Sequence, residues 1–179
     1  MGRIIPPLLL VALANCGAAG DNRQAHDEAG TGQTFALASQ SFADGQPIPA
    51  AHTCDGTNRP PELHWTAPPG GTRSLALVMD DPDAPGGTFR HWGVGGIPAN
   101  VRSMQQGGAV QVVNDFGTKG YGGPCPPHGE RPHRYRFKLY ALDVERLSLP
   151  GDARVDQFET LAAQHRLAVA QLVGTYRRK

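Results

Sequence analysis

Residues 134–142 read RYRFKLYAL and carry the clearest strand signal in the chain. Apolar and basic side chains alternate there, and successive side chains of a strand point to opposite faces of a sheet. One face would bury Tyr135, Phe137, Leu139 and Ala141, while Arg134, Arg136 and Lys138 point the other way. This period of two predicts a half-buried strand.

Outward from this stretch, the chain shows further short extended segments. Apolar or alternating runs predict strands at 35–37, 63–65, 74–79, 89–97 and 109–113. One helix is expected over 155–167, with Asp152 as its N-cap, because apolar residues recur there at three-to-four spacing. Gly174 and β-branched neighbours favour a last strand over 171–176 rather than more helix. With 23 glycines and 16 prolines, a mainly β domain is predicted.

The first 33 residues are not expected to belong to this domain. Residues 1–16 combine one basic residue with a short apolar run, which is typical of a secretory signal and too short to span a bilayer. The run ends at Leu-Ala-Asn-Cys, so lipidation at Cys16 and cleavage of an ordinary signal peptide both remain open. Residues 17–33 are small and polar and predict a flexible leader. The domain is therefore predicted over 34–179.

Two cysteines remain in that domain, Cys54 and Cys125. An even pair in an exported domain is a disulfide candidate. Two separate, partly buried thiols are the alternative.

Acids, histidines and glycines gather in three places. The segment DDPDAP at 80–85 follows a predicted buried strand, where prolines would fix the carboxylates or simply shape a turn. His91 and Trp92 would point to opposite faces of one strand, with His91 either lining a cleft or serving only the structure. The run GYGGPCPP at 120–127 could leave backbone N–H groups open to an anion. His133 and Tyr135 share a strand face, and each can donate a hydrogen bond.

These strings, with HRYRFKLYALD at 133–143, resemble the signature regions of the phosphatidylethanolamine-binding protein family, in its bacterial Raf-kinase-inhibitor-like branch. The flanking IPAAHTCDG and LVGTYRR segments agree, so the resemblance covers about 34–178. It implies a β-sandwich of two antiparallel sheets with one or two short helices, the clearest near the C-terminus. It also implies a small pocket that accepts phosphate-like groups, lipid headgroups and small anions. By the same resemblance the pocket residues would be Asp81, Asp83, Pro85, His91, Gly123, Pro124, His133 and Tyr135.

Acids in an anion pocket pose an electrostatic problem, because a phosphate would be repelled by them. We expect one of the two pocket acids, Asp81 or Asp83, to hold either His91 or His133 in its charged form, so that the histidine meets the anion.

Three functions follow as hypotheses. The first is an exported, non-catalytic binding module for a small anionic or phosphorylated ligand, with no cofactor and no metal. The second is a metal-dependent or acid–base hydrolase that uses Asp81, Asp83, His91 and His133. The third is a regulator of an extracytoplasmic protein partner such as a protease. A formal charge of +1 gives no basic field for nucleic acid. The expected location is the periplasm or cell envelope, with membrane contact only through a lipid on Cys16.

Overall fold

The computed structural model describes residues 1–2, 34–104 and 110–179. The predicted signal over 1–16, with Cys16, and the predicted leader over 17–33 lie outside the described residues, apart from Met1 and Gly2. The first residue of the strand predicted over 109–113 lies outside them as well. Of the described residues, 34–104 and 110–179 belong to one compact unit.

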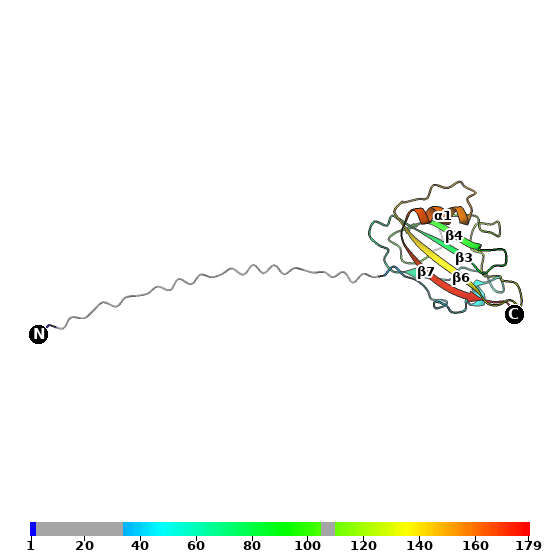
Figure 1. The fold of residues 1–179 in the computed structure, drawn as a ribbon, viewed down its shortest axis with the longest axis horizontal. Coiled ribbons are helices and arrows are strands. Elements are labelled where there is room, and N and C mark those ends of the chain that lie inside the picture. The colour runs from blue at the N-terminus through cyan, green and yellow to red at the C-terminus, as the bar shows by residue number, and fades with distance from the viewer. Residues whose placement is uncertain (3–33, 105–109) are drawn as a thin grey trace. The chain divides into compact units, whose positions relative to one another are not determined.

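A five-stranded antiparallel sheet forms the centre of this domain (Figure 1). Its order is β5 (Val110–Gln111), β4 (Phe89–Pro98), β3 (Ser74–Asp81), β6 (His133–Leu142), β7 (Arg166–Tyr176). All eight residues of β3 are buried because the strand runs between β4 and β6. A second antiparallel sheet pairs β1 (Leu37–Ser39) with β2 (Leu63–Trp65). The predicted mainly β fold with two antiparallel sheets is confirmed.

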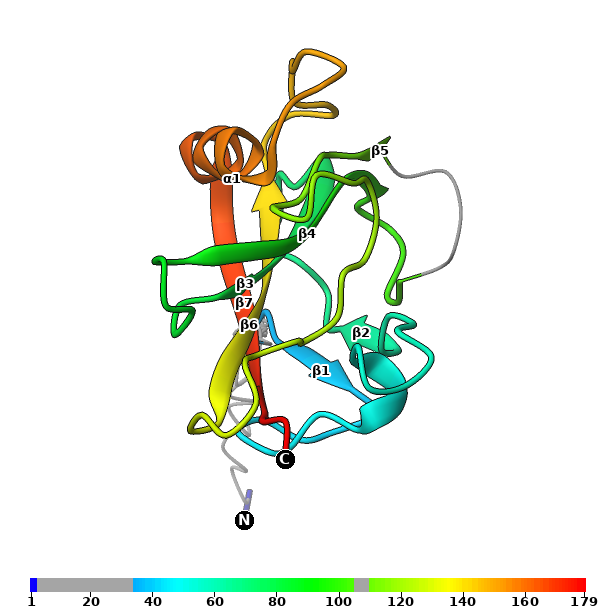
Figure 2. The same ribbon diagram turned by 90° about the vertical axis from the view of Figure 1, so that its right-hand side faces the viewer.

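The two faces of the large sheet are covered differently. One face packs against the small sheet, where Leu37 and Trp65 join Leu77, Phe137 and Leu139 in the main core. The other face packs against α1 (Val155–Gln164), where Val78 and Tyr140 meet Val155 and Phe158. Figure 2 shows α1 and the small sheet on opposite sides of the large one. The alternation along β6 therefore sends its side chains into two cores. Tyr135, Phe137 and Leu139 enter the main core, and Tyr140 enters the core beneath α1.

The N-cap of the predicted helix is Arg154 rather than Asp152, and Gln157 accepts the Arg154 backbone N–H at 3.1 Å. The helix begins at Val155 as predicted, but it is shorter than the predicted 155–167. It ends at Gln164 because the chain then pairs with β6 from Arg166 onward. The last strand is therefore longer than the predicted 171–176. A short 3-10 turn over Ala50–His52 is the other helical piece in the described residues.

The prediction that His91 and Trp92 point to opposite faces was wrong. Trp92 lies opposite Met79 and Arg90 lies opposite Asp80, so His91 is an extra residue in β4 without a partner on β3. Such a β-bulge breaks the alternation and redirects a side chain. Trp92 enters the main core, and the His91 ring packs edge-on to Tyr135 of the same core at 5.3 Å.

The predicted disulfide is present. Cys54 and Cys125 are bonded, with Cα atoms 5.4 Å apart across a sequence separation of 71 residues. It ties the loop after the 3-10 turn to the Gly- and Pro-rich loop that precedes β6. In the part of the chain that is described, no helix has the length and apolar character needed to cross a bilayer.

Candidate functional site

A cavity of about 180 Å³ opens where the end of β3, the start of β4 and the start of β6 converge. The end of β3 contributes Asp81, the bulged β4 contributes His91, and β6 contributes His133 and Tyr135. The loops that join these strands complete the wall. The full lining is Asp81, Ala84, Pro85, Phe89, His91, Phe116, Cys125, Pro126, Pro127, His133 and Tyr135.

The His133 ring lies between two carboxylates. Its Nδ1 is 2.8 Å from Asp81 Oδ2 and its Nε2 is 2.9 Å from Glu130 Oε2. A carboxylate can only accept, so a ring that faces one at each nitrogen must carry both protons. Burial works against the charge, but the two hydrogen bonds and the two negative charges outweigh it and raise the pKa of His133 above 6.5. The two carboxylates therefore favour the protonated, cationic form of the His133 ring.

His91 has the opposite character. Its Nδ1 is 2.8 Å from the Gly122 carbonyl oxygen, so that nitrogen must be the donor. Burial lowers the pKa of His91, and the carbonyl of Gly122 offsets this only in part. The ring is held neutral between the aromatic edges of Phe89, Phe116 and Tyr135. One charged and one neutral histidine thus share the cavity.

Tyr135 supplies a donor that the protein does not use. Its side chain is fully buried, and its hydroxyl has no hydrogen-bond partner among the described residues. Burial comes first among the causes that raise the pKa of Tyr135, followed by the charge of Asp81 and a side-chain interaction with the same carboxylate that falls short of hydrogen-bond geometry, so the hydroxyl keeps its proton. An unpaired buried hydroxyl costs free energy. A hydroxyl without a protein partner is therefore usually hydrogen-bonded to a molecule that enters from the solvent.

Asp83, by contrast, turns away from the cavity. Its carboxylate accepts two side-chain bonds and the backbone N–H of Arg134, at 2.8–2.9 Å. These bonds hold the pKa of Asp83 well below its ordinary value. Of the two acids considered, it is Asp81 that pairs with a histidine, and the histidine is His133. Asp83 stabilises the turn that carries Asp81, whose Oδ1 accepts the Asp83 N–H at 2.8 Å.

The glycines of the central loop serve close packing. The Gly122 N–H donates to the His91 carbonyl at 3.1 Å, and the Gly123 N–H donates to Asn58 Oδ1 at 2.8 Å. The interpretation that these two N–H groups are open to an anion was therefore wrong. A Cβ on Gly123 would collide with the backbone of His52, so the loop can pass there only without a side chain. Neither Gly123 nor Pro124 lines the cavity, and the Pro124 carbonyl accepts the Cys54 N–H.

Five of the eight predicted pocket residues thus come together at the cavity: Asp81, Pro85, His91, His133 and Tyr135. Glu130 was missed, although an acid three residues before a signature histidine is a usable signal. Phe89 and Phe116 were missed too, and Phe116 is 48% exposed at the cavity wall. Nothing in the sequence places Phe116, because its position depends on how the loop over 114–129 folds.

The donor set favours binding an oxyanion. The cavity offers the Tyr135 hydroxyl as a donor, together with the His133 ring, whose two nitrogens already meet Asp81 and Glu130. His133 faces a carboxylate at each ring nitrogen, whereas His91 donates from Nδ1 to a carbonyl and keeps the lone pair on Nε2. No group of three or more His, Cys, Asp and Glu side chains in the described segments has the arrangement of a metal site.

Comparison with known proteins agrees with the fold. A family profile described as "Phosphatidylethanolamine-binding protein" matches residues 38–177. A UPF0098 protein of Aquifex aeolicus is 44% identical, over 82% of this chain and 91% of its own. A Mycobacterium tuberculosis protein named "Putative lipoprotein LppC" is 42% identical, over 94% of this chain and 91% of its own.

Among solved structures, the crystal structure of Escherichia coli YbcL, described as a new member of the mammalian PEBP family, superposes with a TM-score of 0.77. It is 34% identical and covers 81% of this chain and 99% of its own. A PEBP homologue from Chlamydia trachomatis gives a TM-score of 0.75 at 36% identity, over 82% of this chain and 99% of its own. The fold, the order of the signature segments and the profile match over 38–177 agree: the chain belongs to the phosphatidylethanolamine-binding protein family.

Proposed function

We propose that this protein is an exported binding module whose cavity at the ends of β3, β4 and β6 accepts a small oxyanion of the phosphate or phospho-headgroup type. The observation that carries the proposal is the Tyr135 hydroxyl, a buried donor without a partner in a cavity that also holds the His133 cation. A ligand oxygen that accepts from both would satisfy the hydroxyl and meet a positive charge.

The arrangement of charges answers the problem of acids in an anion site. Asp81 is already paired with His133, because its carboxylate lies 2.8 Å from Nδ1 and both side chains are nearly fully buried. The pair has no net charge but directs the other edge of the cation, Nε2, away from Asp81. That edge now meets the Glu130 carboxylate, whose side chain is 41% exposed and can swing into solvent. An incoming oxyanion would take the place of Glu130, which is itself an oxyanion.

The size of the cavity limits the ligand. A volume of about 180 Å³ is below the roughly 300–1,000 Å³ of sites that enclose drug-sized molecules. It suits a phosphate or a compact headgroup and leaves no room for acyl chains. This agrees with a family named for a phospholipid headgroup.

Export is part of the same proposal. The disulfide between Cys54 and Cys125 favours an oxidising compartment, and a 42% identical relative is named as a lipoprotein. We therefore place the protein in the cell envelope, with Cys16 as the attachment point of a lipid anchor. Mass spectrometry of the protein purified from membranes would test this, and an unmodified Cys16 would contradict the anchor.

A titration tests the ligand. The full-length chain is titrated with inorganic phosphate and with phosphoethanolamine at pH 6, while the ring signals of His91 and His133 are followed by NMR. Saturable shifts of both rings are expected. The shift of His91 should be lost in His133→Gln. The shifts of both rings should be retained in the matched control His165→Gln, which removes a surface histidine that is also paired with an aspartate.

A His133→Gln variant leaves Asp81 buried without its partner and could lose stability for that reason. Tyr135→Phe is therefore the second variant, since it removes one hydroxyl and no charge. Absent or non-saturating ring shifts in a folded wild type would refute the proposal. Equal effects of the His133 and His165 substitutions would refute it too.

A further inference from the structure

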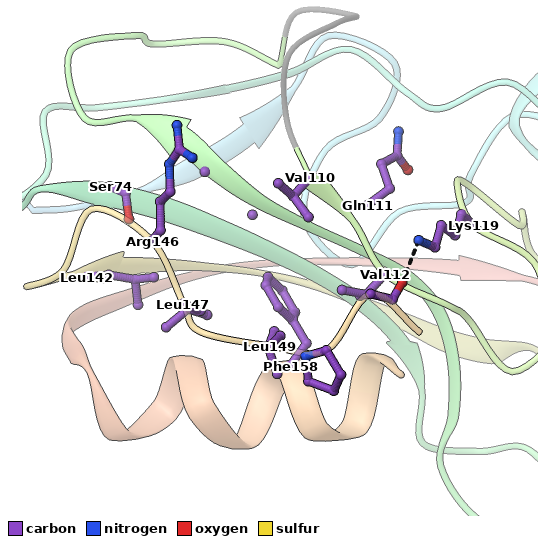
Figure 3. A pocket seen from close by; sticks show the side chains of 14 residues that line it. Ser74, Val110, Gln111, Val112, Lys119, Leu142, Arg146, Leu147, Leu149 and Phe158 are labelled. Carbon is purple, nitrogen blue, oxygen red and sulfur yellow. Dashed lines mark hydrogen bonds between the residues drawn. The ribbon is translucent and has the colours of Figure 1, made fainter. Parts of the chain in front are cut away.

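A second, larger cavity lies away from the His133 site (Figure 3). It has a volume of about 500 Å³, which is within the range of about 300–1,000 Å³ that small-molecule sites occupy. Its walls come from β4, β5, the loop over 146–151 and α1, with Ser74 of β3, Leu142 of β6 and Lys119 completing them. It shares no lining residue with the first cavity.

Glycines in β4 make room for its apolar floor. A Cβ on Gly95 would lie 2.8 Å from the Phe158 ring, so the aromatic ring of α1 can approach the strand only because the side chain is missing. The register shifts here between β3 and β4, and Gly96 takes a left-handed φ of 69°. The apolar side chains around this floor are Val110, Val112, Leu142, Leu147, Leu149 and Phe158.

The ionisable side chains at this cavity all have the same sign. Lys119 and Arg146 are its two charged members, and no acidic residue is among its described lining residues. Lys119 Nζ donates to the Gly151 carbonyl at 2.7 Å, which fixes a cation at one side. Figure 3 shows Arg146 well apart from it, beyond Val110. Within the described parts of the chain, Arg146 has no ion-pair or hydrogen-bond partner.

We propose that this cavity binds a single-chain amphiphile with an anionic head, such as a medium-chain alkyl carboxylate. The apolar walls would take the alkyl chain because its burial is favourable in proportion to the area removed from water. The head would lie at Arg146, the cation that is left unpaired. The absence of a lining carboxylate selects against cationic amphiphiles. The proposal does not rest on the anion site, because the two cavities are lined by different residues.

Chain length tests the apolar part. Hexanoate, octanoate and decanoate are titrated below their micelle concentrations into the full-length chain, with methyl NMR signals of Val110, Leu147 and Leu149 as the readout. Each added methylene should lower the dissociation constant by roughly two- to fourfold, as expected when it leaves water. Affinity that does not change with chain length would overturn the proposal. So would shifts that map to the cavity around His133.

Charge tests the head. Arg146→Gln should raise the dissociation constant for decanoate roughly fivefold, in the range of a partly exposed ion pair. Arg177→Gln is the control, because it removes an exposed arginine that directly follows β7 and does not line the cavity, so it should change nothing. Decyltrimethylammonium, which has the same chain and the opposite charge, should bind at least tenfold more weakly. Equal binding of the two amphiphiles, or equal effects of the two substitutions, would overturn the assignment of Arg146.

Discussion

Replacing Tyr135 with Phe should stabilise the free protein and weaken its ligand binding. The hydroxyl is buried without a partner in the described structure, and an unsatisfied buried hydroxyl costs about 1–3 kcal/mol. Phenylalanine keeps the ring that packs against His91 at 5.3 Å and removes the polar atom. We expect a gain of about 1 kcal/mol in the free energy of unfolding, or about 3 °C in melting temperature for a domain of this size.

Ligand binding should change in the opposite direction. A hydrogen bond to a charged partner contributes about 1.5–3 kcal/mol, which corresponds to a loss of about tenfold or more in phosphate affinity. The assay pairs urea denaturation, for stability, with the phosphate titration, for affinity. Few substitutions separate these two quantities in sign, because most side chains that bind ligand also contribute to packing.

Tyr140→Phe is the matched control. Tyr140 is also a buried tyrosine of β6, but its hydroxyl donates to Glu159 at 2.9 Å on the face covered by α1. Its loss should cost about 1–2 kcal/mol of stability and leave phosphate affinity unchanged. If Tyr135→Phe destabilises the protein as Tyr140→Phe does, the Tyr135 hydroxyl has a partner in the free protein and the reasoning fails. Unchanged phosphate affinity in Tyr135→Phe would also refute the reasoning.

Three further outcomes are expected. Glu130→Gln should raise phosphate affinity about threefold to fivefold at pH 6, because an exposed ion pair of this kind contributes up to about 1 kcal/mol. The phosphate titration measures this change, and weaker binding would contradict the displacement of Glu130. The free energy of unfolding should fall as pH rises from about 6.5 through the raised pKa of His133, because the folded protein keeps a proton there that the unfolded chain releases. Urea denaturation at several pH values should show this decline in the wild type and lose it in His133→Gln. Replacing Cys54 and Cys125 by Ser should cost up to about 4 kcal/mol, as expected for a closed loop of this length; a midpoint equal to that of the wild type under oxidising conditions would exclude a stabilising disulfide.

Most of the fold could be predicted from the period of two. The alternation along β6 is strong because one face meets the main core and the other meets charged partners, so its side chains follow a simple pattern. The end of α1 could not be predicted in this way. Leu167 and Val169 extend the apolar pattern of the helix, but they lie exposed in β7. Pairing with β6 decides their conformation, and that pairing joins residues distant in sequence.

The sequence predicted most of the residues of the candidate site, but it did not predict how they are arranged. The pairing of Asp81 with His133 depends on where β3 and β6 end relative to one another, and the sequence left the choice of acid and histidine open. The position of His91 depends on a bulge, which inserts one residue without any local signal in the HW pair. The apolar cavity of Figure 3 was not foreseen, because its lining residues are scattered along the sequence from Ser74 to Phe158.

The close packing at Gly122 and Gly123 affects how related chains diverge. A side chain at Gly122 would collide with Phe116, and one at Gly123 with the backbone of His52. Selection for folding alone would therefore retain Gly123, where the obstacle is backbone and not a partly exposed side chain, even in a descendant whose cavity had changed its ligand or ceased to bind one. This glycine is therefore expected wherever the loop keeps this path, whether or not the cavity binds a ligand. Divergence in binding would instead appear at positions such as Glu130, a partly exposed side chain that meets His133.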